Sequence, residues 1–212
     1  MAVEHVEHAE HAEHMDWHEP PPEAYSRVTD PERFRPVHGH ALDLLARLEA
    51  AYDVTASAAF ELLPGAMQPF AHARPPVTLT PAVPGAAPLS VAFTTFPSLL
   101  VRAGRWYGTS FPICACDACG GGAAEEVWRL DELVGNVVAG HFEEEVRLPI
   151  FGEARLSYAF GPRSPREGSR AAGWGAIPRE LARTLVGGGI RRVEWQPWPR
   201  RSLQATDSAP AV

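Results

Sequence analysis

Three cysteines stand within six residues of the chain, at Cys114, Cys116 and Cys119. Thiolates this close together can face one soft cation, and they are ligands that structural zinc sites prefer. The glycines at 120–122 let the loop fold tightly after the cluster. The pattern therefore indicates a small structural metal site with Cys114, Cys116 and Cys119 as ligands, zinc as the cofactor and no catalytic residue.

The number of ligands is the weak point of this interpretation, because a closed zinc site needs four and the sequence has no second cysteine pair. His141 follows a predicted helix of about 17 residues, which places it roughly 25 Å from the cluster at 1.5 Å per residue. The other candidates are His38, His40, His72 and Asp117, and spacing favours none of them. A partner subunit or a water molecule could also fill the position.

Two alternatives to a metal site stay open. Cys116 and Cys119 form a Cys-x-x-Cys pair, which is also the pattern of a thiol redox enzyme. The thioredoxin pattern, however, needs a parallel βαβ context, and three glycines separate this pair from the next predicted helix. The second alternative is that the thiols have no binding or catalytic role, which the missing fourth ligand favours.

The composition excludes several classes of enzyme. All 19 basic residues are arginine, so the chain has no lysine for a Walker A loop, a pyridoxal Schiff base or a kinase phosphate site. No HExxH, GxSxG or EF-hand pattern occurs, and no GxGxxG follows a strand. We therefore expect a protein that is not an enzyme. Ala, Gly, Pro and Arg make up 91 of the 212 residues, which indicates GC-rich codons and a bacterial source.

The net charge of −7 is unevenly distributed along the chain. Residues 1–20 hold six acids and no arginine, whereas residues 147–201 hold eleven arginines and four acids. Arginine and tryptophan alternate near the C-terminal end, which suggests an accessory protein that binds nucleic acid or another anion. The near-neutral body argues against nucleic acid as a partner. The residues of this end are Arg191, Arg192, Trp195, Trp198, Arg200 and Arg201.

Hydrophobic spacing predicts an α+β fold with two main amphipathic helices, at about 29–52 and 123–139, and an antiparallel sheet. Thr29 or Asp30 would cap the first helix. Strands are predicted at 77–80, 89–96, 99–107, 145–150, 153–160 and 190–195, and a short helix at 178–185. The glutamates at 143–145 are interpreted as a solvated run. We expect disordered tails at both ends.

The predicted organisation has four parts. A disordered, acidic, histidine-rich tail and proline linker (1–22) precedes an α+β core (23–160), an Arg/Trp-rich extension packed on that core (161–201) and a disordered tail (202–212). Neither a signal peptide nor an apolar run of 18 residues is found, so we expect a cytoplasmic protein without a membrane partner. The oligomeric state stays open.

The first tail repeats Glu-His-x, which spaces histidines at 5, 8, 11 and 14, with His18 following. Such a tract could bind nickel or zinc loosely. The plainer interpretation is a disordered tail that lies upstream of an alternative start at Met15.

Three stretches of the sequence resemble a family of uncharacterised actinobacterial proteins, a domain of unknown function. They are the segment 20–34 (PPPEAYSRVTDPERF) and the Cys-Asp-Ala-Cys turn at 116–119, together with the residues from Val137 to Pro149. The resemblance covers about residues 20–150 and implies no activity, cofactor or catalytic residue. In the family pattern acidic residues follow the second cysteine of the CxxC turn, where this chain has three glycines.

Overall fold

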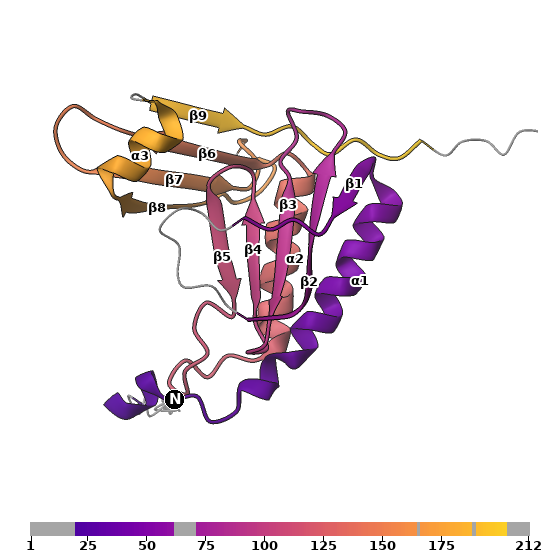
Figure 1. Cartoon of the computed structure of the whole chain (residues 1–212), viewed down its shortest axis with the longest axis vertical. Coiled ribbons are helices and arrows are strands. Elements are labelled where there is room, and N and C mark those ends of the chain that lie inside the picture. Colours follow the sequence, from indigo (N-terminus) through magenta and orange to yellow (C-terminus); the bar gives the residue numbers. More distant parts are fainter. Residues whose placement is uncertain (1–19, 62–70, 165, 188–189, 203–212) are drawn as a thin grey trace, which may run out of the picture.

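The structure is a computed structural model that describes residues 20–61, 71–164, 166–187 and 190–202. Within these residues, three α-helices accompany two antiparallel sheets of five and four strands (Figure 1). The α+β prediction is therefore confirmed, with two sheets in place of the one expected. The predicted tails fall outside the described residues, apart from 20–22 and 202. No helix in the described part of the chain is long and apolar enough to cross a membrane.

The first sheet is an antiparallel meander in which each strand pairs with the next along the chain. The strands predicted at 89–96 and 99–107 are joined through Pro97–Ser98 as an antiparallel hairpin, in which Val91 lies opposite Val101. The predicted strand 99–107 divides into two, because the chain turns at residues 104–106. The strands are β1 (Val54–Ser57), β2 (His72–Pro81), β3 (Leu89–Thr94), β4 (Leu99–Ala103) and β5 (Tyr107–Phe111).

Two long helices, α1 (Arg35–Ala51) and α2 (Ala123–Val138), cover one face of this sheet (Figure 1). Their apolar residues recur every three or four positions, which places them on a single stripe. The stripes pack on β3 and β4 to form the main core. Its helical members include Val37, Ala41, Leu45 and Leu48 of α1 and Leu130, Leu133, Val134 and Val137 of α2.

The start of the first helix differs from the prediction. The chain first forms two short 3-10 turns, η1 (Pro22–Ser26) and η2 (Pro31–Phe34), and α1 begins only at Arg35. Neither Thr29 nor Asp30 caps a helix with its side chain, because Thr29 instead binds Asp117, far along the chain.

The second sheet has the strand order β8-β7-β6-β9, and α3 (Arg179–Val186) packs on one of its faces around Ala182. Residues 161–201 contribute β8 and β9, which pair with β7 and β6 of the preceding segment. The boundary expected at residue 160 stays a prediction. The strands are β6 (Phe142–Arg147), β7 (Ala154–Phe160), β8 (Ala171–Ile177) and β9 (Ile190–Glu194).

The glutamate run at 143–145 lies in β6, where successive side chains point to opposite faces of the sheet. Glu143 and Glu145 face outward and pair with arginines, among them Arg192 and Arg147 respectively. Glu144 points inward and is only 1% exposed. The interpretation of all three as solvated is therefore wrong for Glu144.

Glu144 joins the two sheets. Its carboxylate accepts hydrogen bonds from the backbone N–H groups of Arg105 (2.6 Å), Trp106 (2.8 Å) and Tyr107 (3.0 Å), which form the turn between β4 and β5. The indole N–H of Trp195, after β9, donates a fourth at 3.1 Å. Burial raises the pKa of Glu144, although these donors oppose the shift. Gly104 has φ of +64°, and a Cβ there would lie 2.5 Å from the carboxylate.

Candidate metal centre

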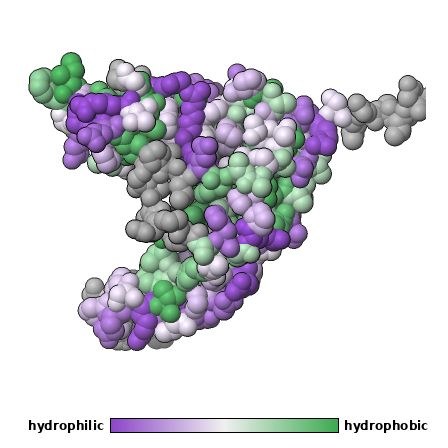
Figure 2. All heavy atoms as spheres, in the orientation of Figure 1, coloured by the Kyte–Doolittle hydropathy of each residue, from purple (hydrophilic) through white to green (hydrophobic). Residues whose placement is uncertain are grey.

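The three cysteines lie in the loop that leads from β5 to α2, residues 112–122. This loop is at the lower end of the molecule in Figure 1, beside the N-terminal segment 22–34. In the view of Figure 2, hydrophilic side chains prevail at this end. The loop is held at both sides by regular structure, since a strand of the main sheet precedes it and a long core helix follows.

The three sulfur atoms converge. The Sγ atom of Cys116 lies 3.2 Å from that of Cys114 and 3.3 Å from that of Cys119, and all three are within 4.8 Å of one another. Thiolates bound to one tetrahedral zinc at about 2.3 Å would stand about 3.8 Å apart. The cluster is thus close to the spacing that a single ion imposes, and it could hold a metal ion.

The environment differs between the thiols. Cys116 is buried, at 6% exposure, whereas Cys114 and Cys119 are exposed. The pKa of Cys116 is lowered by hydrogen bonds with the thiols of Cys114 and Cys119. Hydrogen bonds from the backbone N–H groups of Cys119 and Ala118 lower it further. The contacts with Cys116 and Cys114, together with burial, raise the pKa of Cys119 to about 12. The pKa values of Cys116 and Cys119 are therefore shifted in opposite directions, and Cys116 is the more acidic of these two thiols.

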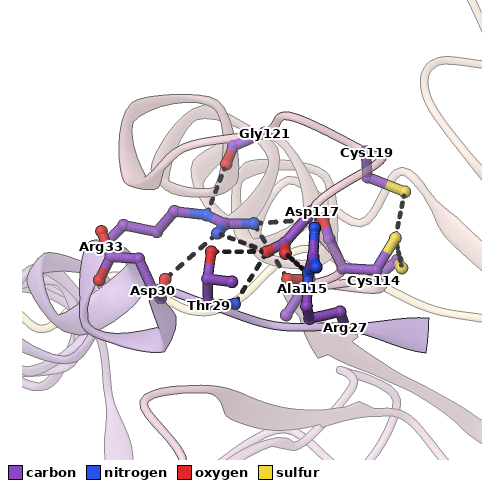
Figure 3. A network of polar contacts seen from close by, with 10 residues as sticks. Arg27, Thr29, Asp30, Arg33, Cys114, Ala115, Asp117, Cys119 and Gly121 are labelled. Carbon is purple, nitrogen blue, oxygen red and sulfur yellow. Dashed lines mark hydrogen bonds and ion pairs between the residues drawn. The ribbon is translucent and has the colours of Figure 1, made fainter. Parts of the chain in front are cut away.

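Asp117 anchors the cysteine loop to the N-terminal segment (Figure 3). Its carboxylate accepts hydrogen bonds from the backbone N–H of Thr29 (2.9 Å), the hydroxyl of Thr29 (3.1 Å) and the guanidinium of Arg27 (3.0 Å). These donors, the Thr29 N–H first, lower the pKa of Asp117. The carboxylate points toward these donors and away from the sulfurs, so it is not the fourth ligand in this arrangement.

Arg33 binds the same loop through its backbone. Its guanidinium donates to the carbonyl oxygens of Ala115 (2.9 Å), Cys116 (3.3 Å) and Gly121 (3.2 Å), which lie on both sides of the last cysteine. The planar fork of arginine suits several such acceptors at once. One side chain therefore holds the start and the end of the cysteine loop together.

Backbone hydrogen bonds add to these contacts. The N–H of Asp117 donates to the carbonyl of Arg27 at 2.8 Å, and the N–H of Ala118 donates to the carbonyl of Ala24 at 3.2 Å. We call the segment 24–33, with its contacts to the loop, the N-terminal clamp. The clamp fixes the backbone of the turn that carries Cys116 and Cys119.

The histidines considered as fourth ligands are not part of the cysteine cluster. His38 contacts the carbonyl of Ser98 at 2.9 Å, and His40 contacts Asp131 at 2.7 Å. His72 begins β2, and His141 follows α2 at the end opposite to the cluster. Among the described residues, the group of close ligand atoms contains the three cysteines and no histidine or carboxylate.

The Arg/Trp-rich end does not present its aromatic side chains at the surface. Trp195 and Trp198 are both buried, and the indole N–H of Trp198 donates to the carbonyl of Ala87 at 2.9 Å. Arg192 pairs with glutamates, and Arg200 stacks on Tyr52. The structure thus separates the guanidinium groups from the aromatic rings that the sequence interleaves.

Sequence reasoning missed the clamp. Arg27, Thr29 and Arg33 lie more than eighty residues from the loop they bind, and no local pattern joins the two. The sequence pattern at Thr29 predicts a helix cap instead, since a hydroxyl before a proline and a glutamate is typical of one. One signal was available, because the segment 20–34 and the turn 116–119 both carry the family resemblance.

A family model described as a family of unknown function (DUF6226) matches residues 2–202. No match was found among curated proteins or among solved structures.

Proposed function

The chain belongs to this family of unknown function, and we propose from its own residues that it is a non-enzymatic protein with a structural zinc site. Cys114, Cys116 and Cys119 are the ligands. The observation that carries the proposal is the convergence of the three sulfurs, each neighbouring pair 3.2 or 3.3 Å apart. Three soft donors so placed suit Zn²⁺ better than they suit a hard cation such as Mg²⁺ or Ca²⁺.

The ion would stabilise the loop between β5 and α2. Zinc binding to thiolates contributes to folding, because the unfolded chain does not hold its ligands together. The N-terminal clamp complements this role, since Arg33 holds the carbonyls of Ala115 and Cys116 and so orients the ligand backbone. Three thiolates and Zn²⁺ would leave one net negative charge, and the carboxylate of Asp117 adds a second. The guanidinium groups of Arg27 and Arg33, both paired with Asp117, balance these two charges.

A thiol redox enzyme is the competing function, and Cys116 with Cys119 would be its pair. The sulfur of Cys116 lies 3.3 Å from that of Cys119, but it lies equally close, at 3.2 Å, to that of Cys114. Thiol–disulfide exchange needs two thiols, whereas a metal site would use all three. The third sulfur therefore supports metal binding over redox exchange.

We also propose a cytoplasmic location and an actinobacterial source. An odd number of clustered thiols suits a reducing compartment, where disulfides do not persist. The absence of lysine and the abundance of Ala, Gly, Pro and Arg support a genome rich in GC.

The proposal is tested by elemental analysis of the full chain, purified under reducing conditions and passed over a column with a moderate chelator. We expect about one equivalent of zinc per chain, as one site requires. A variant with serine at all three cysteines controls for metal held by the histidine tract, and it should lose the ion. Zinc below about a tenth of an equivalent, with a reversible Cys116–Cys119 disulfide, would support the redox function instead.

A further inference from the structure

The turn between β6 and β7, residues 148–153, exposes two neighbouring apolar side chains. Ile150 is 86% exposed and Phe151 is 89% exposed, which makes them the most exposed large apolar side chains of the described residues. Single apolar side chains at a surface need no explanation, whereas adjacent ones that form a joined patch often mark an interaction site. The turn is therefore a candidate contact surface.

The backbone of this turn is fixed by Arg179, the first residue of α3. Its guanidinium donates hydrogen bonds to the carbonyl oxygens of Gly152 at 2.8 Å and Pro149 at 2.9 Å, on either side of the two apolar residues. Leu148, at the start of the turn, packs on the second core. The fold thus holds Ile150 and Phe151 in solvent by specific contacts, and does not leave them on an untied loop.

The turn projects from the molecule. It lies at the left end of the second sheet in Figure 1, and Figure 2 shows hydrophobic atoms at the upper left extremity in the same orientation, beside hydrophilic ones. A stable protein interface buries about 1,200–2,000 Å² in total, which two side chains on a projecting turn do not provide. Anchors at a membrane surface, by contrast, only need to bury apolar side chains about 5–10 Å deep at the headgroup boundary.

The surroundings of the turn are basic, although the whole chain has a net charge of −7. The segments 145–155 and 178–192, which form the turn, its strand ends and α3, contain six arginines and three glutamates, a net charge of +3. Arg147 and Arg155 stand opposite each other where β6 and β7 meet the turn. The partners of Arg179 in the turn are carbonyl oxygens, which do not neutralise its charge.

We propose that this turn docks the protein on the surface of an anionic lipid membrane. Ile150 and Phe151 enter the headgroup boundary, and the arginines beside the turn attract the lipid phosphates. Two apolar side chains give weak and reversible binding, which requires no membrane-spanning helix. The sequence-based expectation of a protein without a membrane partner rested on the lack of a spanning segment, and docking at the surface departs from it. The inference is independent of the proposed zinc site.

The experiment is sedimentation of the full-length protein with vesicles of phosphatidylcholine and phosphatidylglycerol in equal parts, at low salt. We expect the wild type to sediment with these vesicles, and Ile150→Ser/Phe151→Ser to bind at least about tenfold more weakly, since burial of each side chain is worth about tenfold or more. Trp128→Ser is the matched control, because it removes an exposed aromatic side chain (63%) from α2 and should bind like the wild type.

A second arm tests the charge. Vesicles of phosphatidylcholine alone, or added salt, should weaken binding of the wild type, because the attraction of the arginines to the surface is lost or screened. Circular dichroism should be the same for all three proteins, since the replaced side chains are exposed.

Three results would overturn the inference. Wild-type protein that stays in the supernatant with both kinds of vesicle excludes a lipid surface and leaves a partner protein as the ligand of the turn. Equal binding by Ile150→Ser/Phe151→Ser and the wild type shows that another surface docks. Equal binding to anionic and neutral vesicles removes the role of the arginines. None of these results affects the cysteine site.

Discussion

Replacing Glu144 with alanine tests how the two sheets are joined. The substitution removes the acceptor of four N–H donors. The backbone N–H of Trp106 and the indole N–H of Trp195 are buried, whereas the backbone N–H groups of Arg105 and Tyr107 are partly buried. A buried polar group without a partner costs about 1–3 kcal/mol, so the two buried donors alone cost at least about 2 kcal/mol. The stability of a typical domain is about 5–15 kcal/mol, so this cost is measurable.

Urea unfolding monitored by tryptophan fluorescence measures this cost. Glu145→Ala is the matched control, since it removes a neighbouring glutamate that faces outward and pairs with Arg147 at the surface, where such pairs contribute little. A loss below about 1 kcal/mol for Glu144→Ala, or an equal loss in the control, would refute the argument that Glu144 joins the sheets.

The pH dependence of Glu144 provides a second readout. Burial raises its pKa in the folded state above the ordinary value of 4.5, so the folded state holds the proton more tightly than the unfolded state does. Stability of the wild type should therefore fall, relative to Glu144→Gln, as pH rises from about 4.5 toward the raised pKa. Parallel stability curves for the two proteins would contradict the assigned direction.

Three further predictions concern the cysteine loop and the second sheet. Arg33→Ala should weaken zinc binding about tenfold, because outer partners orient the ligands. Arg35→Ala should leave zinc binding unchanged, since Arg35 pairs with Glu32 at the surface. Equal losses in the two variants would contradict the role of the clamp. Zinc at a concentration one hundred times its dissociation constant should raise the free energy of unfolding by about 2.7 kcal/mol. In calorimetry this corresponds to a rise of the melting temperature by roughly 5–10 °C. An equal rise in the variant with serine at all three cysteines would exclude the cysteines as its cause. Burial alone would raise the pKa of Glu143, but hydrogen bonds from Arg170 and Arg192 outweigh it and lower the pKa. The ionised Glu143 therefore stabilises the folded state at pH values above its unfolded-state pKa. This stabilisation is lost as the pH falls through the folded-state pKa of Glu143. Glu143→Gln should abolish that part of acid sensitivity in pH-dependent unfolding, and an unchanged acid transition would count against the pairing.

The sequence predicts the parts of this protein that depend on local periodicity. The apolar stripes of α1 and α2 recur every three or four residues, so both helices are predicted to within a few residues, except at the start of α1. The alternation from Leu89 to Thr94, followed by Pro97–Ser98, likewise indicates the hairpin of β3 and β4. The cysteine cluster is visible because its three residues are neighbours in the chain.

Features that depend on distant contacts are not predictable in this way. Glu144 resembles Glu143 and Glu145 in the sequence, and only its inward position in β6 distinguishes it. Asp117 looks like a metal-ligand candidate, but contacts with Arg27 and Thr29 determine its orientation. Single-sequence patterns contain no information about which distant donors a carboxylate meets. The same reason explains why two sheets are found in place of one.

X-ray absorption at the zinc edge of the full-length protein tests the central claim most directly, because it counts the sulfur and nitrogen atoms around the bound ion. We predict a shell that contains three sulfur atoms at about 2.3 Å. A shell of nitrogen and oxygen alone would place the ion on the histidine tract and contradict a site built from Cys114, Cys116 and Cys119.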